Sequence, residues 1–206
     1  MTFQKSFNYH FSELKDQDNF FVNSTNEEAY KVIKDSLFNQ NVFLNGPKKS
    51  GKSHLCNIWK QINKAIIFHN NFDKIIKLKK NVIIENLFTN LNEEEIFHII
   101  NHCKSFNLKI LITSSKDLNK HEFKLKDLSS RLKSFYHIKI NQPDDEMCKL
   151  YMNKLFYDKQ IIIKNAEIFD FIFKRINRTY NDIYLIVKKI DKLSLEKKRQ
   201  LTIPLV

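Results

Sequence analysis

Both glycines of this 206-residue chain lie in one short segment with the pattern G-x-x-x-x-G-K-[ST]. The segment consists of Gly46, Pro47, Lys48, Lys49, Ser50, Gly51, Lys52 and Ser53. In such a loop, backbone N–H groups hold phosphates, the lysine contacts the β- and γ-phosphates, and the hydroxyl binds Mg²⁺. Because the chain has no other glycine, we expect Gly46 and Gly51 to need a positive φ and a close approach of the backbone to a ligand. The pattern predicts a nucleotide-binding site.

The neighbours of this loop provide the setting that the pattern requires. An apolar run at 42–44 predicts a strand before the loop, and the apolar spacing at 55–62 predicts a helix after it. The N-terminus of such a helix favours bound phosphate. The alternative is an ordinary turn between a strand and a helix. Lys49 stands where many such loops carry another glycine, so the local backbone geometry stays open.

Glu85 is the candidate carboxylate for the magnesium ion. It follows the apolar run 82–84, at the end of a second predicted strand, where aspartate is usual. A simple charged residue at the end of a strand is the alternative. The next residue, Asn86, stands where ATPases of this architecture carry an acid that orients the attacking water, and an amide cannot accept the proton. We therefore predict nucleotide binding with weak hydrolysis or none.

Hydroxyl groups follow a third predicted strand at 109–112. Thr113, Ser114 and Ser115 stand at its end, where hydroxyls can sense a γ-phosphate. Hydroxyls at the ends of strands are also common caps of the backbone. The sequence leaves both roles open.

Five short runs of residues alternate with helical patterns in the first two thirds of the chain. Four of them are short and β-branched, as in buried parallel strands: 42–44, 65–68, 82–84 and 109–112. A fifth run, at 136–140, alternates between apolar and polar residues. The clearest helical patterns are at 24–37, 55–62, 93–106 and 125–135. This alternation predicts an α/β fold with a parallel five-stranded sheet between helices.

The chain changes character at Pro143. Beyond it we find helical patterns only, at 144–157, 166–176 and 180–195. We expect residues 18–141 to form the α/β domain and residues 142–206 to form a small helical lid. Residues 1–17 are polar with isolated aromatic side chains, which predicts a flexible tail.

The chain is basic, with 35 Lys and Arg residues against 23 Asp and Glu residues and a formal net charge of +12. The lysines are scattered, so the charge indicates either a nucleic-acid or acidic partner or a solubilising surface. Cys56, Cys103 and Cys148 form no C-x-x-C pair and are expected to be buried thiols in a reducing compartment. Without an apolar run that approaches 18 residues, we expect a soluble, cytoplasmic protein.

Four segments resemble the DnaA-related AAA+ family of replication proteins, most closely its short Hda-type regulators. Residues 20–30 are similar to the family's F-V-x-x-x-x-N-x-x-A segment beside the adenine, and 46–55 match G-P-x-x-S-G-K-[ST]-H-L. Residues 128–132 resemble the box that contains an arginine finger, and 201–206 resemble the L-T-I-P ending of Hda-type chains. The resemblance runs from about residue 19 to the end and implies an AAA+ P-loop core with a small lid.

The resemblance implies an adenine-nucleotide site, with ADP or ATP and Mg²⁺ as cofactors. It adds Val22, Asn23 and His54 to the residues expected around the nucleotide. The family also has an arginine near the start of the last long helix, facing the phosphates. This chain has Asn181 there, and Arg178, three residues earlier, is the expected substitute. The difference fits Hda-type proteins, which the resemblance implies act while they hold ADP.

The resemblance also makes Arg131 the candidate arginine finger. A finger reaches the nucleotide of a neighbouring subunit and stabilises charge during phosphoryl transfer. Taken alone, an arginine on a polar helix is more often a solvated residue. The family position implies action in trans, on the ATP of the initiator DnaA.

The first residues contain a further short motif. Gln4, Phe7 and Tyr9 are similar to the Q-x-x-[hydrophobic]-x-[hydrophobic] peptide with which family members and polymerases dock on the sliding clamp. Gln4 would hydrogen-bond in a polar pocket while the two aromatic side chains fill an apolar groove. A frayed terminus with chance aromatic residues is the alternative.

The resulting hypothesis is a nucleotide-dependent regulator of chromosomal replication initiation. It docks on the DNA polymerase III sliding clamp, promotes hydrolysis of the ATP bound to DnaA, and meets DNA indirectly through the clamp. The sequence leaves open whether the protein forms a homodimer. The alternative is an autonomous AAA+ ATPase, such as a helicase loader or a truncated initiator, and a small-molecule kinase is a weaker option. ATP turnover by the isolated protein separates these hypotheses.

Overall fold

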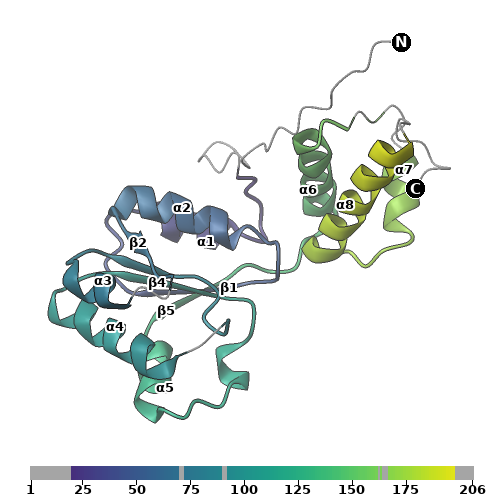
Figure 1. Ribbon diagram of the computed structural model, residues 1–206. Coiled ribbons are helices and arrows are strands. Elements are labelled where there is room, and N and C mark those ends of the chain that lie inside the picture. The colour runs from purple at the N-terminus through teal and green to yellow at the C-terminus, as the bar shows by residue number, and fades with distance from the viewer. Residues whose placement is uncertain (1–19, 70–71, 90–91, 162, 164–166, 198–206) are drawn as a thin grey trace.

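A computed structural model describes residues 20–197, apart from 70–71, 90–91, 162 and 164–166. These residues form a parallel sheet with helices on both faces, followed by a group of helices beside it (Figure 1). The described strands lie in the order β2-β3-β4-β1-β5 and pair in parallel throughout. They are β1 (Val42–Asn45), β2 (Ile66–Ile67), β3 (Val82–Ile84), β4 (Ile110–Ser114) and β5 (Tyr136–Lys139). The predicted five-stranded parallel sheet is confirmed.

The apolar runs form strands because both faces of the sheet are covered. Val42 and Leu44 pack in the hydrophobic cluster on one face, whereas Phe43 packs in the cluster on the other. Successive side chains of a strand point to opposite faces, so a strand covered on both sides must be apolar throughout. In the edge strand β5 only Ile138 is buried, which explains its alternating sequence.

Of the α-helices in the described core, two pack in the hydrophobic cluster on one face of the sheet and three in the cluster on the other, and Figure 1 shows helices on both faces. The first pair is α1 (Glu27–Lys34) and α2 (Lys52–Asn63). The opposite face carries α3 (Phe72–Lys77), α4 (Glu93–Ser105) and α5 (Lys126–Lys133). All of these except α3 fall within predicted helical patterns or extend them by a few residues. The sequence did not predict α3, because its six residues hold fewer than two turns and show no periodicity.

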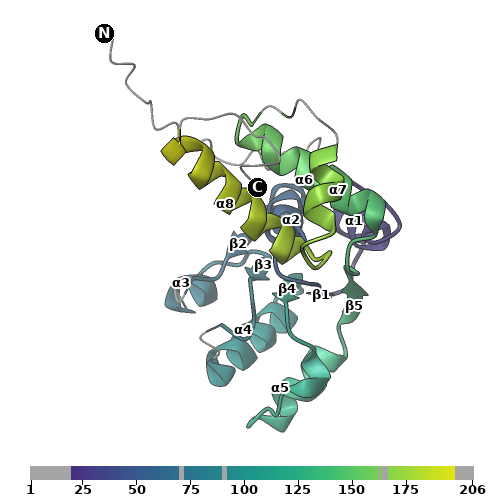
Figure 2. The ribbon, with the colours of Figure 1, turned by 90° about the vertical axis from the view of Figure 1, so that its right-hand side faces the viewer.

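The described part of the lid contains three helices, α6 (Asp145–Asp158), α7 (Glu167–Phe173) and α8 (Tyr180–Lys197). They enclose a hydrophobic cluster of their own, which includes Cys148, Met152, Phe156, Ile172, Ile183 and Val187. Figure 2 views the molecule from the lid side, with α8 in front of α2. Each predicted helical pattern beyond Pro143 therefore contains a helix. The domain boundary between residues 141 and 142 remains our proposal.

The segment before α1 fastens the lid to the core. The Asn23 Nδ2 donates to Oδ2 of Asp144, the N-cap of α6, at 3.0 Å. The Thr25 carbonyl accepts the Asn141 N–H at 2.9 Å, and its hydroxyl lies 3.4 Å from the Tyr180 hydroxyl. The lid is thus held to the core by hydrogen bonds that reach both α6 and α8.

The parallel strands give the core two chemically different edges. All carboxyl ends lie at one edge, where the loop from Gly46 to Ser53 follows β1, Glu85 follows β3 and β4 ends in Thr113 and Ser114. The amino ends of the strands lie at the opposite edge. Ligands of open α/β sheets bind at the carboxyl edge, so the fold brings the predicted site residues to the expected place.

Candidate nucleotide-binding site

A side chain is excluded at Gly46 and at Gly51 for different steric reasons. Gly51, the N-cap of α2, has φ +89°, and a Cβ there would lie 2.8 Å from the Phe20 ring. A Cβ on Gly46 would lie 2.9 Å from the Ile140 Cβ and 3.1 Å from the Ser50 Oγ. The expected positive φ therefore occurs at Gly51 alone of the two. At both positions the close approach that the structure records is to the protein itself.

Lys49 adopts the glycine-like conformation that the loop requires. Its φ is +65°, in the left-handed region that costs a side-chain-bearing residue about 1–2 kcal/mol. Its ammonium lies 3.8 Å from the centre of the Tyr184 ring of α8. The loop thus keeps its turn without a third glycine, and the side chain at this position reaches the lid.

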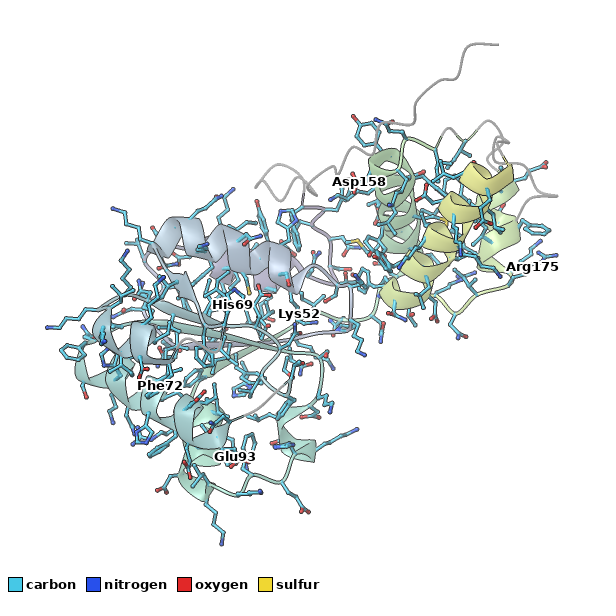
Figure 3. All side chains as sticks on the ribbon, in the orientation of Figure 1. Lys52, His69, Phe72, Glu93, Asp158 and Arg175 are labelled. Atoms are coloured by element: carbon cyan, nitrogen blue, oxygen red, sulfur yellow. The ribbon has the colours of Figure 1, made fainter. Side chains whose placement is uncertain are left out.

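Lys52 binds the loop that precedes it. Its Nζ donates to the carbonyl oxygens of Gly46 and Pro47, at 2.8 and 2.7 Å. Burial lowers its pKa to about 8, although the nearby Glu85 carboxylate favours the charged form. Figure 3 places Lys52 on the side of the core nearest the lid. The ammonium is positioned to exchange two carbonyl partners for phosphate oxygens.

Two further features of the loop fit a polyphosphate. The Ser50 Oγ is buried and has no hydrogen-bond partner among the described residues, and such a group usually has one. The first turn of α2 contains no acidic residue, so its N–H groups and the positive end of the helix dipole are open to an anion. The donor set of this loop is that of a phosphate site.

Ser53 and Glu85 meet as the sequence predicts. The Ser53 Oγ donates to the Glu85 Oε2 at 3.2 Å. Burial and the facing Glu85 carboxylate raise the pKa of the Cys56 thiol well above its usual value, so the thiol beside Glu85 stays protonated and uncharged. A hydroxyl and a carboxylate are suitable ligands for Mg²⁺, which takes its other ligands from phosphates and water. The structure does not bring three His, Cys, Asp or Glu side chains together as a metal site anywhere within the described ranges.

The hydroxyls at the end of β4 serve as caps. The Thr113 Oγ1 accepts the backbone N–H of Asn86 at 3.0 Å. The Ser114 hydroxyl donates to the Lys116 carbonyl at 2.7 Å and accepts the N–H of the same residue. Asn86 itself is exposed with φ +52°. Of the two roles that the sequence left open, these bonds favour capping, and Thr113 fixes the turn that carries Glu85.

The segment 20–26 lies against the loop. Val22 is 41% exposed, and His54 is buried with its ring 5.3 Å from the Phe20 ring. The Asn23 Oδ1 accepts the N–H and hydroxyl of Thr25. Phe20 packs on Gly51 and was not singled out in the sequence, although it opens the family segment. Asn23 and His54 therefore build the wall of the site, and a direct contact of either with nucleotide stays a prediction.

The comparisons with known proteins agree with this geometry. Residues 158–206 match the family model described as "Hda, lid domain". Domain III of the replication initiation protein DnaA from Thermotoga maritima is similar in structure, with a TM-score of 0.73 and 18% identity, over 91% of this chain and 91% of that chain. The chain has a DnaA-related AAA+ fold. The resemblance found in the sequence is thereby confirmed.

Two further proteins are similar to this AAA+ chain. A structure of DnaA bound to AMPPCP and single-stranded DNA has a TM-score of 0.67 and 19% identity over 88% of this chain. This chain spans 66% of that protein, just under two thirds of its length. A Haemophilus influenzae protein described as uncharacterized is 26% identical over 179 residues, which are 78% of this chain and 77% of that protein. At such identities the likeness to solved structures establishes the AAA+ fold.

Arg131 lies at the amino edge of the AAA+ core, away from the phosphate loop. It stands in the last turn of α5, with its guanidinium 5.1 Å from the centre of the Phe97 ring of α4. It shares a cavity with Asn41 and Lys109, the residues just before β1 and β4. A four-residue strand spans about 13 Å, so the length of β1 separates this edge from the loop. The predicted role of Arg131 as an arginine finger stays a prediction.

Arg178 pairs within the lid. Its guanidinium forms an ion pair with the Asp145 carboxylate at the start of α6, and both side chains are largely exposed. Asn181, at the family's arginine position, is partly buried in the first turn of α8. The expected contact of Arg178 with phosphate stays a prediction, since Arg178 would have to leave Asp145 to make it.

Several sequence predictions fall on residues outside the described part of the chain. These are the tail at 1–17 with the clamp-binding residues Gln4, Phe7 and Tyr9, and the ending at 201–206. Among the described helices, none has the length and hydropathy needed to span a lipid bilayer.

Proposed function

We propose that this AAA+ protein is an adenine-nucleotide-binding regulator of replication initiation in the cytoplasm. It binds ADP or ATP with Mg²⁺, docks on the DNA polymerase sliding clamp, and promotes hydrolysis of initiator-bound ATP through Arg131. The similarity of its lid to the Hda lid domain supports this role. The similarity of its fold to a DnaA structure bound to AMPPCP supports the choice of an adenine nucleotide.

The nucleotide would bind at the carboxyl edge of the sheet. Lys52 and the N–H groups at the start of α2 hold the phosphates, and the Ser50 hydroxyl gains the partner that it lacks among the described residues. Ser53 and Glu85, already 3.2 Å apart, bind the magnesium ion. Phe20, Val22 and the lid close the space around the base. The bound nucleotide holds core and lid in one arrangement.

The position of Arg131 is the observation that carries the proposal. The residue is far from its own loop, and no carboxylate within the described ranges pairs with it. An arginine that is always charged, supported by an aromatic ring and turned away from its own nucleotide is suited to a nucleotide in trans. Asn86 supports the same division of roles, because an amide at this position cannot accept the proton of an attacking water.

The decisive experiment measures hydrolysis of the partner's ATP. Initiator loaded with labelled ATP is incubated with clamp on DNA and with wild-type, Arg131→Ala or Lys133→Ala protein. We expect Arg131→Ala to slow hydrolysis at least about 100-fold, since an arginine finger contributes about 10³–10⁵-fold. Lys133 is an exposed lysine on the same helix, and its replacement should leave the rate unchanged. Undiminished hydrolysis with Arg131→Ala would falsify the proposal.

Clamp docking is tested separately. Immobilised clamp should retain the wild-type protein and lose Gln4→Ala, because glutamine and the aromatic side chains of Phe7 and Tyr9 supply the anchors of such peptides. Ser6→Ala, between the anchors, is the matched control. Equal retention of both variants would remove the clamp from the proposal and leave the nucleotide site in place.

The contact between Ser53 and Glu85 favours a second candidate. The Ser53 hydroxyl and the Glu85 carboxylate are suitable ligands for the magnesium ion that an autonomous AAA+ ATPase, such as a helicase loader or a truncated initiator, would need. Brisk ATP turnover by the isolated protein, abolished by Lys52→Ala, would support this candidate over the regulator.

A further inference from the structure

A cavity of about 540 Å³ lies on the lid, between the end of α7 and one face of α8. We call it the lid cavity. Residues 174–177, which join the two helices, form one side of it, and the other consists of residues that share a face of α8: Asp182, Leu185, Ile186 and Lys189. Figure 3 shows Arg175, a lining residue, on the side of the lid away from the core and from Lys52. The lid cavity is therefore separate from the candidate nucleotide site, and its volume lies within the range of ligand pockets, about 300–1,000 Å³.

Part of the lining of the lid cavity is apolar. Leu185 is 52% exposed, although it stands well inside the long helix α8. Ile176 and Ile186 line the cavity as well, and both pack against the hydrophobic cluster of the lid. A single exposed leucine is common on protein surfaces. A leucine that lines a hollow can in addition contact an apolar side chain that another molecule places there.

Three exposed cationic residues, Lys174, Arg175 and Lys189, line the same cavity. None of them forms an ion pair with a carboxylate of the described residues. Four other lid cations, by contrast, pair with acidic side chains: Lys154, Lys159, Arg178 and Lys192. The positive charge of the lid cavity is thus available to an anionic partner.

Arg175 is held in place before any partner binds. Its guanidinium lies 3.5 Å from the centre of the Phe171 ring, and its Nη1 donates to the Phe171 carbonyl at 2.9 Å. This bond also covers a carbonyl near the end of α7, where a helix carries partial negative charge that would repel an anion. The guanidinium has five N–H donors in a planar fork, so the others can donate to a carboxylate.

The single acid among the described lining residues has a structural role. Asp182 stands in the first turn of α8, where an acidic side chain stabilises the positive end of the helix dipole. Its backbone N–H donates to the Thr179 hydroxyl at 3.1 Å, which fixes the start of the helix. The three cations less this one acid leave the lining with a formal charge of +2.

We propose that the lid cavity docks an acidic segment of a partner protein. One apolar side chain of that segment lies against Leu185, and its carboxylates pair with Arg175 and Lys189. The charge and the apolar part of the lining are both complementary to such a segment. A single-stranded nucleic acid fits less well, because the described lining offers no aromatic side chain for a base to stack on and Asp182 would repel its phosphates. The inference goes beyond the proposed function and requires no part of it.

A labelled peptide tests the docking site on the full chain. The probe has two leucines between runs of Asp and Glu, and fluorescence anisotropy and NMR follow its binding. We expect weak binding that falls at least about fivefold with Lys189→Glu, which reverses a charge without breaking an ion pair of the described chain, and with Leu185→Ser. A neutral peptide, with Asn and Gln in place of the acids, should also bind more weakly.

Lys188→Glu and Leu195→Ser are the matched controls, because both residues are exposed on α8 and neither lines the lid cavity. Both variants should bind the probe as the wild type does. Arg175→Lys keeps the charge and loses the planar fork, so its affinity should lie between those of the wild type and Arg175→Ala.

Equal affinity of the Lys189→Glu and Lys188→Glu proteins overturns the proposal, as does a lack of binding or equal binding of the acidic and neutral peptides. An oligothymidylate of similar length that binds more tightly than the acidic peptide, and depends on Lys189, assigns the cavity to nucleic acid and also overturns it. Lys52→Ala should leave peptide binding unchanged, and a loss would place the peptide at the phosphate loop instead of the lid. Lys189→Glu should in turn leave ADP binding unchanged, so the lid cavity and the nucleotide site stand or fall in separate measurements.

Discussion

The ammonium of Lys49 lies 3.8 Å from the centre of the Tyr184 ring, and this contact joins the phosphate loop directly to the lid. The family that the chain resembles is expected to make this connection in the other direction, with a lid arginine that reaches the phosphates. Here Asn181 stands at the arginine position, and a loop lysine reaches a lid aromatic ring instead. Movement of the loop on binding phosphate would therefore be transmitted to α8 through this contact.

Removing this contact should weaken the attachment of lid to core. A cation–π contact at an exposed site is worth about 0.5–1 kcal/mol, so a double-mutant cycle of Lys49→Met and Tyr184→Leu should give a coupling energy of that size in urea unfolding. Tyr184→Phe keeps the ring and should keep the stability of the wild type. A coupling energy of zero would show that the two side chains touch without stabilising each other.

Gly51 should tolerate no side chain. Gly51→Ala places a Cβ at φ +89° and 2.8 Å from the Phe20 ring, and we expect it to cost about 1–2 kcal/mol of unfolding free energy from the backbone alone. The ring contact adds to that cost, and Phe20→Leu combined with Gly51→Ala should recover only this added part. Thermal or urea unfolding measures both. A Gly51→Ala protein with the same unfolding free energy as the wild type would contradict the loop geometry.

Much of the fold could be predicted because its signals are local. Buried parallel strands are short apolar runs, and the phosphate loop has a fixed residue pattern, so β1, β3 and the pair of Ser53 and Glu85 were all expected. The contacts that distinguish this protein could not be predicted from the sequence. Lys49 meets Tyr184, and Arg178 meets Asp145, only through the packing of lid against core and of α6 against α8. No periodicity or motif encodes such pairs of distant residues.

The lowered pKa of Lys52 predicts a change of protonation when phosphate binds. Its folded-state pKa of about 8 lies below the ordinary lysine pKa of 10.5, so the unfolded chain binds more protons between these values. The free protein should therefore gain stability relative to a Lys52→Met variant as pH rises from about 8 to 10.5, and the burial penalty is fully present below pH 8. A flat difference across this range would show that Lys52 titrates normally.

Nucleotide binding should raise the pKa of the Lys52 ammonium, the opposite of the effect of burial. Phosphate oxygens favour the charged ammonium and raise its pKa again, so ADP binding near pH 8.5 should take up protons. Calorimetry in buffers of different ionisation enthalpy measures the uptake. In Lys52→Arg the guanidinium is always charged, and any binding that remains should show no such proton uptake. Equal uptake by both proteins would assign the proton to another group.

Asn86 should be the residue that limits ATP turnover by the isolated chain. Its φ of +52° lies in the left-handed region, which Asn and Asp tolerate better than Glu, so Asn86→Asp can supply an acid without strain in the turn. The backbone N–H bond to Thr113 would be kept, since the substitution leaves the main chain unaltered. We expect the ATP turnover to rise about 10- to 100-fold, at the low end of what a positioned base contributes.

The matched control is Asn86→Ala, which removes the amide without adding a base and should leave turnover at the basal rate. Lys52→Ala combined with Asn86→Asp should abolish the gain, because turnover at the phosphate loop needs that ammonium. If Asn86→Asp stays inactive while ADP and ATP still bind, a second element of the catalytic apparatus is absent. Asn181 is then the next position to change, because an arginine in the first turn of α8 would bring a lid cation toward the phosphate loop, whose Lys49 already reaches Tyr184 of the same helix.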